Sequence, residues 1–324
     1  FVGCHALAPT IQWLTLFRVL GFATAVGMFP VAATMIVEVA PARYRGTLSA
    51  WLQMSYPLGF AIGALVASFF LADLGWRATF YPAFIVIPIA FLLGAGLKET
   101  KRFAHVRQPG TPTAEAPKAK RRPLSAHIAE LLSPQLRRRS IICFLGTIAS
   151  NLAIAGVTYF LPTFLIQDRG ISEADAAGML VWSWAIAAIG YLLASYVGEF
   201  VLTRRNTVIL YQWLGALCFG LTLWLAESTT LLMLGIGVST MFFFGSESMR
   251  MPMVAEIFPT RLRATASSTV GALGVTSASL TAPLLIPPTV TALGWTWTFV
   301  LFAVVPLVIA GLIFLCLENF PVGV

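Results

Sequence analysis

Three ionisable side chains lie deep within long apolar stretches of this sequence: Arg18, Glu247 and Arg250. Placing a charge inside a lipid bilayer costs at least about 2.5–3.5 kcal/mol, so each of them needs a partner or a function. Glu247 and Arg250 are three residues apart, which places them on one face of a helix. The pair could bind an anion at Arg250 and a proton at Glu247, or it could be an ion pair that only stabilises helix packing.

If the pair is functional, an arriving carboxylate would compete with Glu247 for the Arg250 guanidinium, which holds carboxylates through two parallel hydrogen bonds. Released from Arg250, Glu247 would be easier to protonate, and anion binding would then be coupled to proton binding. Arg18 could add a second cation to the site, which favours an anionic ligand, or it could extend toward the outer membrane interface.

Other side chains within the apolar stretches extend this set. Asn151 and Tyr159 lie on one predicted helix and Gln53 on another, and a buried amide in lipid needs a hydrogen-bond partner. We therefore include all three in the predicted substrate and proton pathway. Trp182 and Trp184 could stack against a ring, although we favour packing or interface anchoring for both.

Residue patterns typical of enzymes are not found. The four cysteines are far apart, and there is neither a CxxC motif nor a Cys/His cluster with zinc spacing. The sequence also contains no GxSxG motif, no His/Asp cluster and no Walker A motif. We expect no catalytic residues, no metal site, no cofactor and no ATP hydrolysis.

Composition identifies the setting of these residues. Hydrophobic residues make up 58% of the chain and charged residues 10%, with a mean hydropathy of +0.85. Soluble domains carry about 25% charged residues, so much of this surface must face lipid. The net charge of +8 does not indicate nucleic-acid binding, because the basic residues lie in loops between apolar stretches and no aromatic-and-basic motif accompanies them.

We predict an all-α membrane protein with nine spans, each near the roughly 20 residues needed to cross the hydrocarbon core. They cover residues 12–38, 47–71, 77–97, 140–166, 176–200, 207–226, 230–257, 265–287 and 294–317. Of the 21 Lys and Arg residues, 17 fall in loops on one side, and only Arg77 and Arg169 on the other. Basic loops stay in the cytoplasm, so this side is predicted to be cytoplasmic.

The spans form two blocks, residues 1–97 and residues 140–324, joined by a hydrophilic linker at residues 98–139. The middle of the linker is rich in Pro, Ala, Lys and Arg and is predicted to be disordered. Residues 125–132 could form a short amphipathic helix on the inner leaflet. We expect an integral, multi-pass protein of a bacterial inner membrane with this linker in the cytoplasm.

The two blocks are internal repeats. Residues 38–46 (EVAPARYRG) recur as residues 256–264 (EIFPTRLRA), and residues 75–80 recur as residues 294–299, at offsets of 218 and 219. The offset predicts two pseudo-symmetric six-helix halves. It also predicts that the first half lacks roughly 80 residues here, its first two helices and most of the third.

These motifs resemble the major facilitator superfamily of secondary transporters. The resemblance is carried by the two Glu-x-x-Pro-x-Arg-x-Arg loops, by Arg18-Val-Leu-Gly21, and by residues 195–205, a divergent copy of the family's loop signature. It implies a central cavity lined by the helices of Asn151 and Glu247, and it links Arg18 to coupling or substrate binding. It also implies an inner gate of charged residues at the helix ends: Glu38, Arg43, Arg45, Glu199, Arg204, Glu256, Arg261 and Arg263.

Residues 52–59 (LQMSYPLG) resemble the organic-acid and metabolite proton symporters of the family. We therefore predict a monomeric secondary transporter that moves a small organic anion, a carboxylate metabolite, by alternating access with protons as the coupling ion. A sugar porter or a drug or metabolite exporter of the same superfamily is an alternative. A membrane sensor that does not transport is an alternative of another class.

Overall fold

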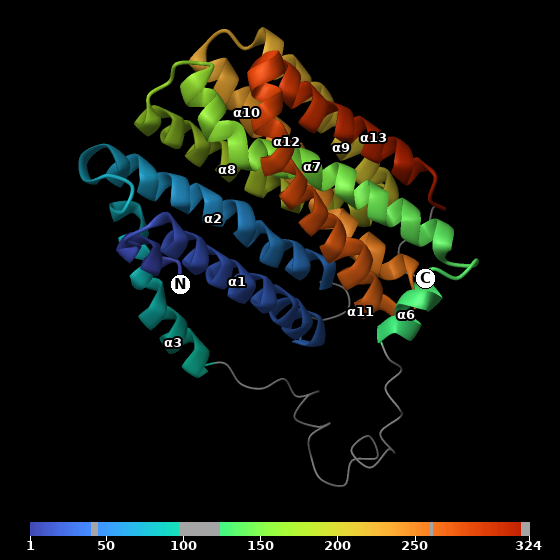
Figure 1. Cartoon of the computed structure of the whole chain (residues 1–324). Coiled ribbons are helices and arrows are strands. Elements are labelled where there is room, and N and C mark those ends of the chain that lie inside the picture. The colour runs from blue at the N-terminus through green and yellow to red at the C-terminus, as the bar shows by residue number, and fades with distance from the viewer. Residues whose placement is uncertain (40–44, 97–123, 260–261, 319–324) are drawn as a thin grey trace.

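The computed structural model describes residues 1–39, 45–96, 124–259 and 262–318, and within these ranges all regular structure is helical (Figure 1). The first block contains η1 (Gly3–Leu7), α1 (Ile11–Val39), α2 (Arg45–Leu74), η3 (Ala78–Phe84) and α3 (Val86–Gly96). The remaining elements are α6 (Leu124–Leu131), α7 (Arg137–Gln167), α8 (Glu173–Tyr196), η4 (Val197–Val201), α9 (Arg204–Leu225), α10 (Thr229–Ile257), α11 (Arg263–Ala266), η6 (Ser267–Ala272), α12 (Leu273–Phe299), η7 (Val300–Val304) and α13 (Val305–Leu315).

Seven helices of the described chain are long and apolar enough to cross a membrane. The last of them, Ser267–Leu315, is much longer than one span. It covers most of the predicted spans 265–287 and 294–317, and its backbone leaves the helical conformation at Gly294. The predicted span at residues 12–38 corresponds to α1, whose segment Ile11–Thr24 is apolar but short by itself. The helical membrane architecture predicted from the sequence is therefore confirmed.

Two glycines at equivalent places of the sequence repeat share an unusual backbone conformation. Gly75 has φ of +75° and Gly294 has φ of +79°, in a region that favours glycine because a Cβ would be strained there. In both copies the threonine four residues later donates a side-chain hydrogen bond to a backbone oxygen of the preceding turn. The repeat found in the sequence thus extends to the geometry of the bend.

Serine and threonine N-caps begin three consecutive helices of the second block. Ser172, Thr203 and Ser228 each accept a hydrogen bond from a backbone N–H in the first turn of α8, α9 and α10. Such caps satisfy N–H groups that have no partner within the helix. Each of these helices therefore begins at the residue after its cap.

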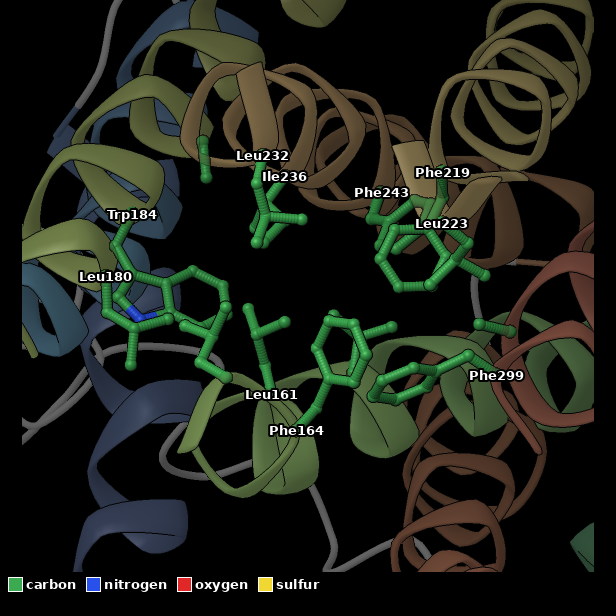
Figure 2. Close-up of a cluster of buried hydrophobic side chains, with 14 of the residues drawn as sticks. Leu161, Phe164, Leu180, Trp184, Phe219, Leu223, Leu232, Ile236, Phe243 and Phe299 are labelled. Atoms are coloured by element: carbon green, nitrogen blue, oxygen red, sulfur yellow. The ribbon is translucent and has the colours of Figure 1, made fainter. Parts of the chain in front are cut away.

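Helix α2 of the first block packs along α8 of the second block, and α1 lies on the far side of α2 (Figure 1). Within the second block, α8 and α9 pack against α10, while α7 packs against α12 and α13. Aromatic and branched side chains fill the space between these helices (Figure 2). At its centre, Phe299 is fully buried against Phe164 and Phe219.

The short helix expected at residues 125–132 is present as α6. Its Leu131 is 3% exposed and packs into the apolar cluster at the adjoining end of the second block. The Leu131 carbonyl accepts a hydrogen bond from the Ser140 hydroxyl of α7 at 2.8 Å. This helix is therefore attached to the second block, next to the start of α7.

Candidate functional site

Helices α8 and α10 approach each other closely because glycines face each other between them. A Cβ added at Gly190 would lie 2.8 Å from the backbone carbonyl carbon of Met241, and one added at Gly245 would lie 2.9 Å from the Gly190 oxygen. Small residues allow such backbone approach between membrane helices. The approach brings the α8 side chains next to the segment of α10 that carries Glu247 and Arg250.

Glu247 and Arg250 form a bidentate ion pair in this segment of α10. The Arg250 Nε donates to Glu247 Oε1 at 2.8 Å, and Arg250 Nη2 donates to Glu247 Oε2. The Arg250 side chain is 1% exposed and that of Glu247 is 12% exposed. Breaking a buried pair of this kind typically costs about 3–5 kcal/mol, since the remaining charge is left uncompensated.

Helix α7 supplies two further partners to the pair. The Thr147 hydroxyl accepts a hydrogen bond from Arg250 Nη1 at 2.9 Å, and Asn151 Nδ2 donates to Glu247 Oε1 at 3.3 Å. Asn151 Nδ2 also donates to the Thr147 backbone oxygen at 3.1 Å. The four side chains therefore form one buried polar network that joins α7 to α10.

An aromatic cluster lies one helical turn from Glu247 along α10. Phe244 contacts Trp184 and Tyr191 of α8, with ring centroids 5.5 and 6.2 Å apart, and Tyr56 of α2 at 6.0 Å. Phe60 of α2 contacts both Tyr56 and Trp184, at 5.0 and 5.5 Å. The cluster joins the first block to the second, next to the polar network.

Three of the residues predicted to line the pathway are not joined to this network by any described hydrogen bond. Arg18 on α1 is exposed, Gln53 on α2 is partly buried, and Tyr159 on α7 is 38% exposed. Among the predicted pathway residues, the described contacts thus bring Asn151, Glu247 and Arg250 together.

Part of the charged gate motif can be located. Arg204 Nη2 lies 3.7 Å from Glu199 Oε1, with side chains 16% and 12% exposed, so this pair joins the middle of η4 to the start of α9. Arg263 is exposed, and its Nε donates to the Phe258 oxygen at 3.4 Å. The other predicted gate positions lie outside the described residues, either entirely (Arg43, Arg261) or in their side chains (Glu38, Arg45, Glu256).

Thr147 contacts the polar network and Tyr56 contacts the adjoining aromatic cluster, and sequence reasoning did not select them. Thr147 lies four residues before Asn151, so the two share a face of α7, and this spacing was a usable signal. Tyr56 lies three residues after Gln53 in a stretch singled out only for its family resemblance. Within the described residues, no group of three or more His, Cys, Asp or Glu side chains could hold a metal ion.

Several curated transporters are similar to this chain. The niacin transporter of Acinetobacter baylyi is 25% identical over 335 residues, which cover 97% of this chain and 75% of that protein. The 4-hydroxybenzoate transporter of Pseudomonas aeruginosa is 28% identical, covering 94% of this chain and 71% of that protein. The cis,cis-muconate transport protein of A. baylyi is 24% identical, covering 82% and 64%. The chain thus spans 64–75% of the length of these relatives.

Solved transporter structures share the fold. A bacterial homologue of the human lysosomal transporter Spinster superimposes with a TM-score of 0.63 at 18% identity, covering 97% of this chain and 79% of that one. A bacterial homologue of the iron transporter ferroportin gives a TM-score of 0.56 at 14% identity, covering 95% and 74%. At these identities the likeness concerns the arrangement of helices.

Residues 1–246 match the family profile of the Major Facilitator Superfamily. The match extends over both blocks and includes Glu199 and Arg204 of the gate motif. The members of this family are transport proteins, so the match indicates that this chain is a transport protein and not an enzyme. This chain is an integral membrane transport protein and belongs to the Major Facilitator Superfamily.

Proposed function

We propose that this protein is a secondary transporter that moves a small organic carboxylate together with protons across a bacterial inner membrane by alternating access. The observation that carries the proposal is the buried bidentate pair of Glu247 and Arg250, held by Thr147 and Asn151 of α7. Relatives named for niacin, 4-hydroxybenzoate and cis,cis-muconate support a carboxylate as substrate.

In this proposal Glu247 occupies the place that the substrate carboxylate takes. Arg250 is 1% exposed and its three nitrogens already have partners, so a substrate carboxylate that takes the Nε and Nη2 positions must displace Glu247. Arginine prefers planar, bidentate acceptors, which a second carboxylate provides. Glu247 then loses its cation and takes up a proton, with the Asn151 amide still beside it to accept or donate a hydrogen bond.

The halves then move around this site. Charged pairs such as Glu199 with Arg204 hold helix ends together at the cytoplasmic side, and they rearrange when the halves rock. Arg18, Gln53 and Tyr159 remain in the proposed pathway as residues that the substrate meets in other states of the cycle. The protein acts as a monomer in this scheme, which needs no residue from a second chain.

Transport by the intact protein in proteoliposomes tests the proposal, with 4-hydroxybenzoate as the probe. Glu247→Gln should retain exchange of external for internal probe but lose accumulation driven by a pH difference, because the amide cannot take up the proton. Arg250→Lys should weaken apparent affinity by roughly tenfold, because an ammonium lacks the bidentate fork and charged hydrogen bonds contribute about 1.5–3 kcal/mol.

Arg77→Lys is the matched control, since Arg77 lies between α2 and η3, where its Nη2 donates to the Ala8 oxygen. This variant should accumulate the probe normally. Normal accumulation by both Glu247→Gln and Arg250→Lys across the pH range would show that the pair is only structural.

A further inference from the structure

We infer that Tyr56 is a specificity-determining residue, and that its ring binds the flat carbon skeleton of an unsaturated carboxylate whose charged group is held at Arg250. The inference rests on the proposed function, because it assigns a second part of the same site. It concerns the aromatic cluster defined above, Tyr56, Phe60, Trp184, Tyr191 and Phe244.

The first argument is position. Phe244 and Glu247 are three residues apart on α10 and therefore lie on one face of that helix. Tyr56 contacts Phe244 through its ring, with the two ring centroids 6.0 Å apart. A small molecule with its carboxylate at Arg250 would therefore have its carbon skeleton within reach of these rings.

The second argument is exposure. Phe244, Trp184 and Tyr191 are 2–4% exposed, and Figure 2 shows the Trp184 indole directed into the apolar interior. Tyr56 is 50% exposed although it touches both Phe60 and Phe244. Within the described residues, Tyr56 therefore keeps more free ring surface than Phe244, Trp184 or Tyr191, and this surface is available to a second flat molecule.

The third argument is that Tyr56 belongs to the other block. It lies on α2, whereas Glu247 and Arg250 lie on α10, and α2 packs along α8. A residue that reaches the site from the opposite half contacts the substrate only when the halves are close together. Tyr56 would then select substrates by their shape when the halves close, after Arg250 has selected them by their charge.

Ring contacts distinguish flat from puckered substrates. Aromatic pairs contribute about 0.5–1.5 kcal/mol in addition to the free energy gained from the surface that they bury. A saturated ring of similar size lacks this additional contribution. Benzoate and cyclohexanecarboxylate carry the same charge on six-membered rings, so they differ mainly in this respect. The intact protein should bind benzoate about three- to tenfold more tightly than cyclohexanecarboxylate.

Calorimetric titration of the purified intact protein with these two probes is the test. Tyr56→Leu should reduce the preference for benzoate to less than about twofold, whereas Tyr56→Phe should keep it, because phenylalanine retains the ring. Tyr196→Leu is the matched control, since Tyr196 is 61% exposed and its ring lies 5.3 Å from that of Phe200. It should leave the preference unchanged.

The outcomes separate this inference from the proposed function. The inference is wrong if Tyr56→Leu keeps the preference, or weakens both probes equally, or if the unsubstituted protein shows no preference. If Arg250→Lys leaves both affinities unchanged while Tyr56→Leu abolishes the preference, the arginine assignment fails and the role of Tyr56 stands. Failure of the unsubstituted protein to bind either probe contradicts both.

Discussion

The Arg250 guanidinium illustrates how a single charged residue is accommodated inside an apolar bundle. Its Nε and Nη2 donate to Glu247, and its Nη1 donates to the Thr147 hydroxyl, while the side chain is 1% exposed. Glu247 in turn receives the Asn151 amide. An unpaired donor on such a buried cation would be expensive, so each of these partners contributes to keeping the charge in place.

Thr147→Val should therefore destabilise the protein, because valine has the shape of threonine and cannot accept the hydrogen bond from Arg250 Nη1. Leaving that buried donor unsatisfied costs about 1–3 kcal/mol. A lower thermal unfolding midpoint in detergent would reveal the loss. Thr158→Val, at another buried threonine of α7 whose side chain makes none of the described hydrogen bonds, is the control and should change the midpoint much less. Equal midpoints for Thr147→Val and the unsubstituted protein would contradict the structural role of this hydroxyl.

The charged residues of the site could be predicted from the sequence, whereas their small polar and aromatic neighbours could not. Glu247 and Arg250 were predictable because an ionisable residue within an apolar stretch is rare. Thr147 was not selected, because threonine is common in membrane helices and often bonds its own backbone, as Thr222 does here. Tyr56 was missed because its contact with Phe244 joins residues almost 190 positions apart, which no local spacing can indicate.

The helix pair α8 and α10 determines whether the site can be assembled at all. Gly190 and Gly245 allow the two backbones to approach, and the approach places Tyr191 and Trp184 against Phe244. Helix positions could be predicted from hydropathy alone. The particular helix neighbours could not, because they depend on which small residues face each other in three dimensions.

Gly190→Ala should separate α8 from α10, because the added methyl group would lie 2.8 Å from the Met241 carbonyl carbon, which belongs to helical backbone and cannot move alone. Overpacking of this kind costs about 1–3 kcal/mol. We expect a lower thermal midpoint and weaker binding of benzoate. On the same helix, Gly178→Ala meets no atom within 4 Å and should leave both unchanged. Comparable stability of the two variants would mean that the close approach is not required.

At the scale of the molecule, several arginines of the described second block gather at one end of its helices. Arg138 and Arg205 donate to the backbone oxygens of Cys316 and Leu317, and Arg139 pairs with Glu318, so this end includes the starts of α7 and α9 and the end of α13. The turn that contains Glu227 lies at the other end of α9. The charge asymmetry of the loops predicts that the basic end faces the cytoplasm.

Cysteine labelling in intact cells measures this orientation. In a variant whose four cysteines are replaced, Glu227→Cys should react with a membrane-impermeant maleimide added outside. Gln135→Cys, exposed between α6 and α7, should react only after the membrane is permeabilised. Labelling of Gln135→Cys from outside would reverse the predicted orientation.

The pairing of Glu247 with Arg250 has a further consequence for a carrier that works across an electrical potential. The empty site is electrically neutral, since the two side-chain charges cancel. If one carboxylate takes the arginine and one proton takes the glutamate, the loaded site is neutral as well. Moving one elementary charge through 100 mV involves about 2.3 kcal/mol. Neither the empty nor the loaded site carries a net charge, so neither would involve this energy when it moves across the membrane. The membrane voltage would then neither drive nor hinder the cycle, and accumulation against the substrate gradient would depend on the pH difference.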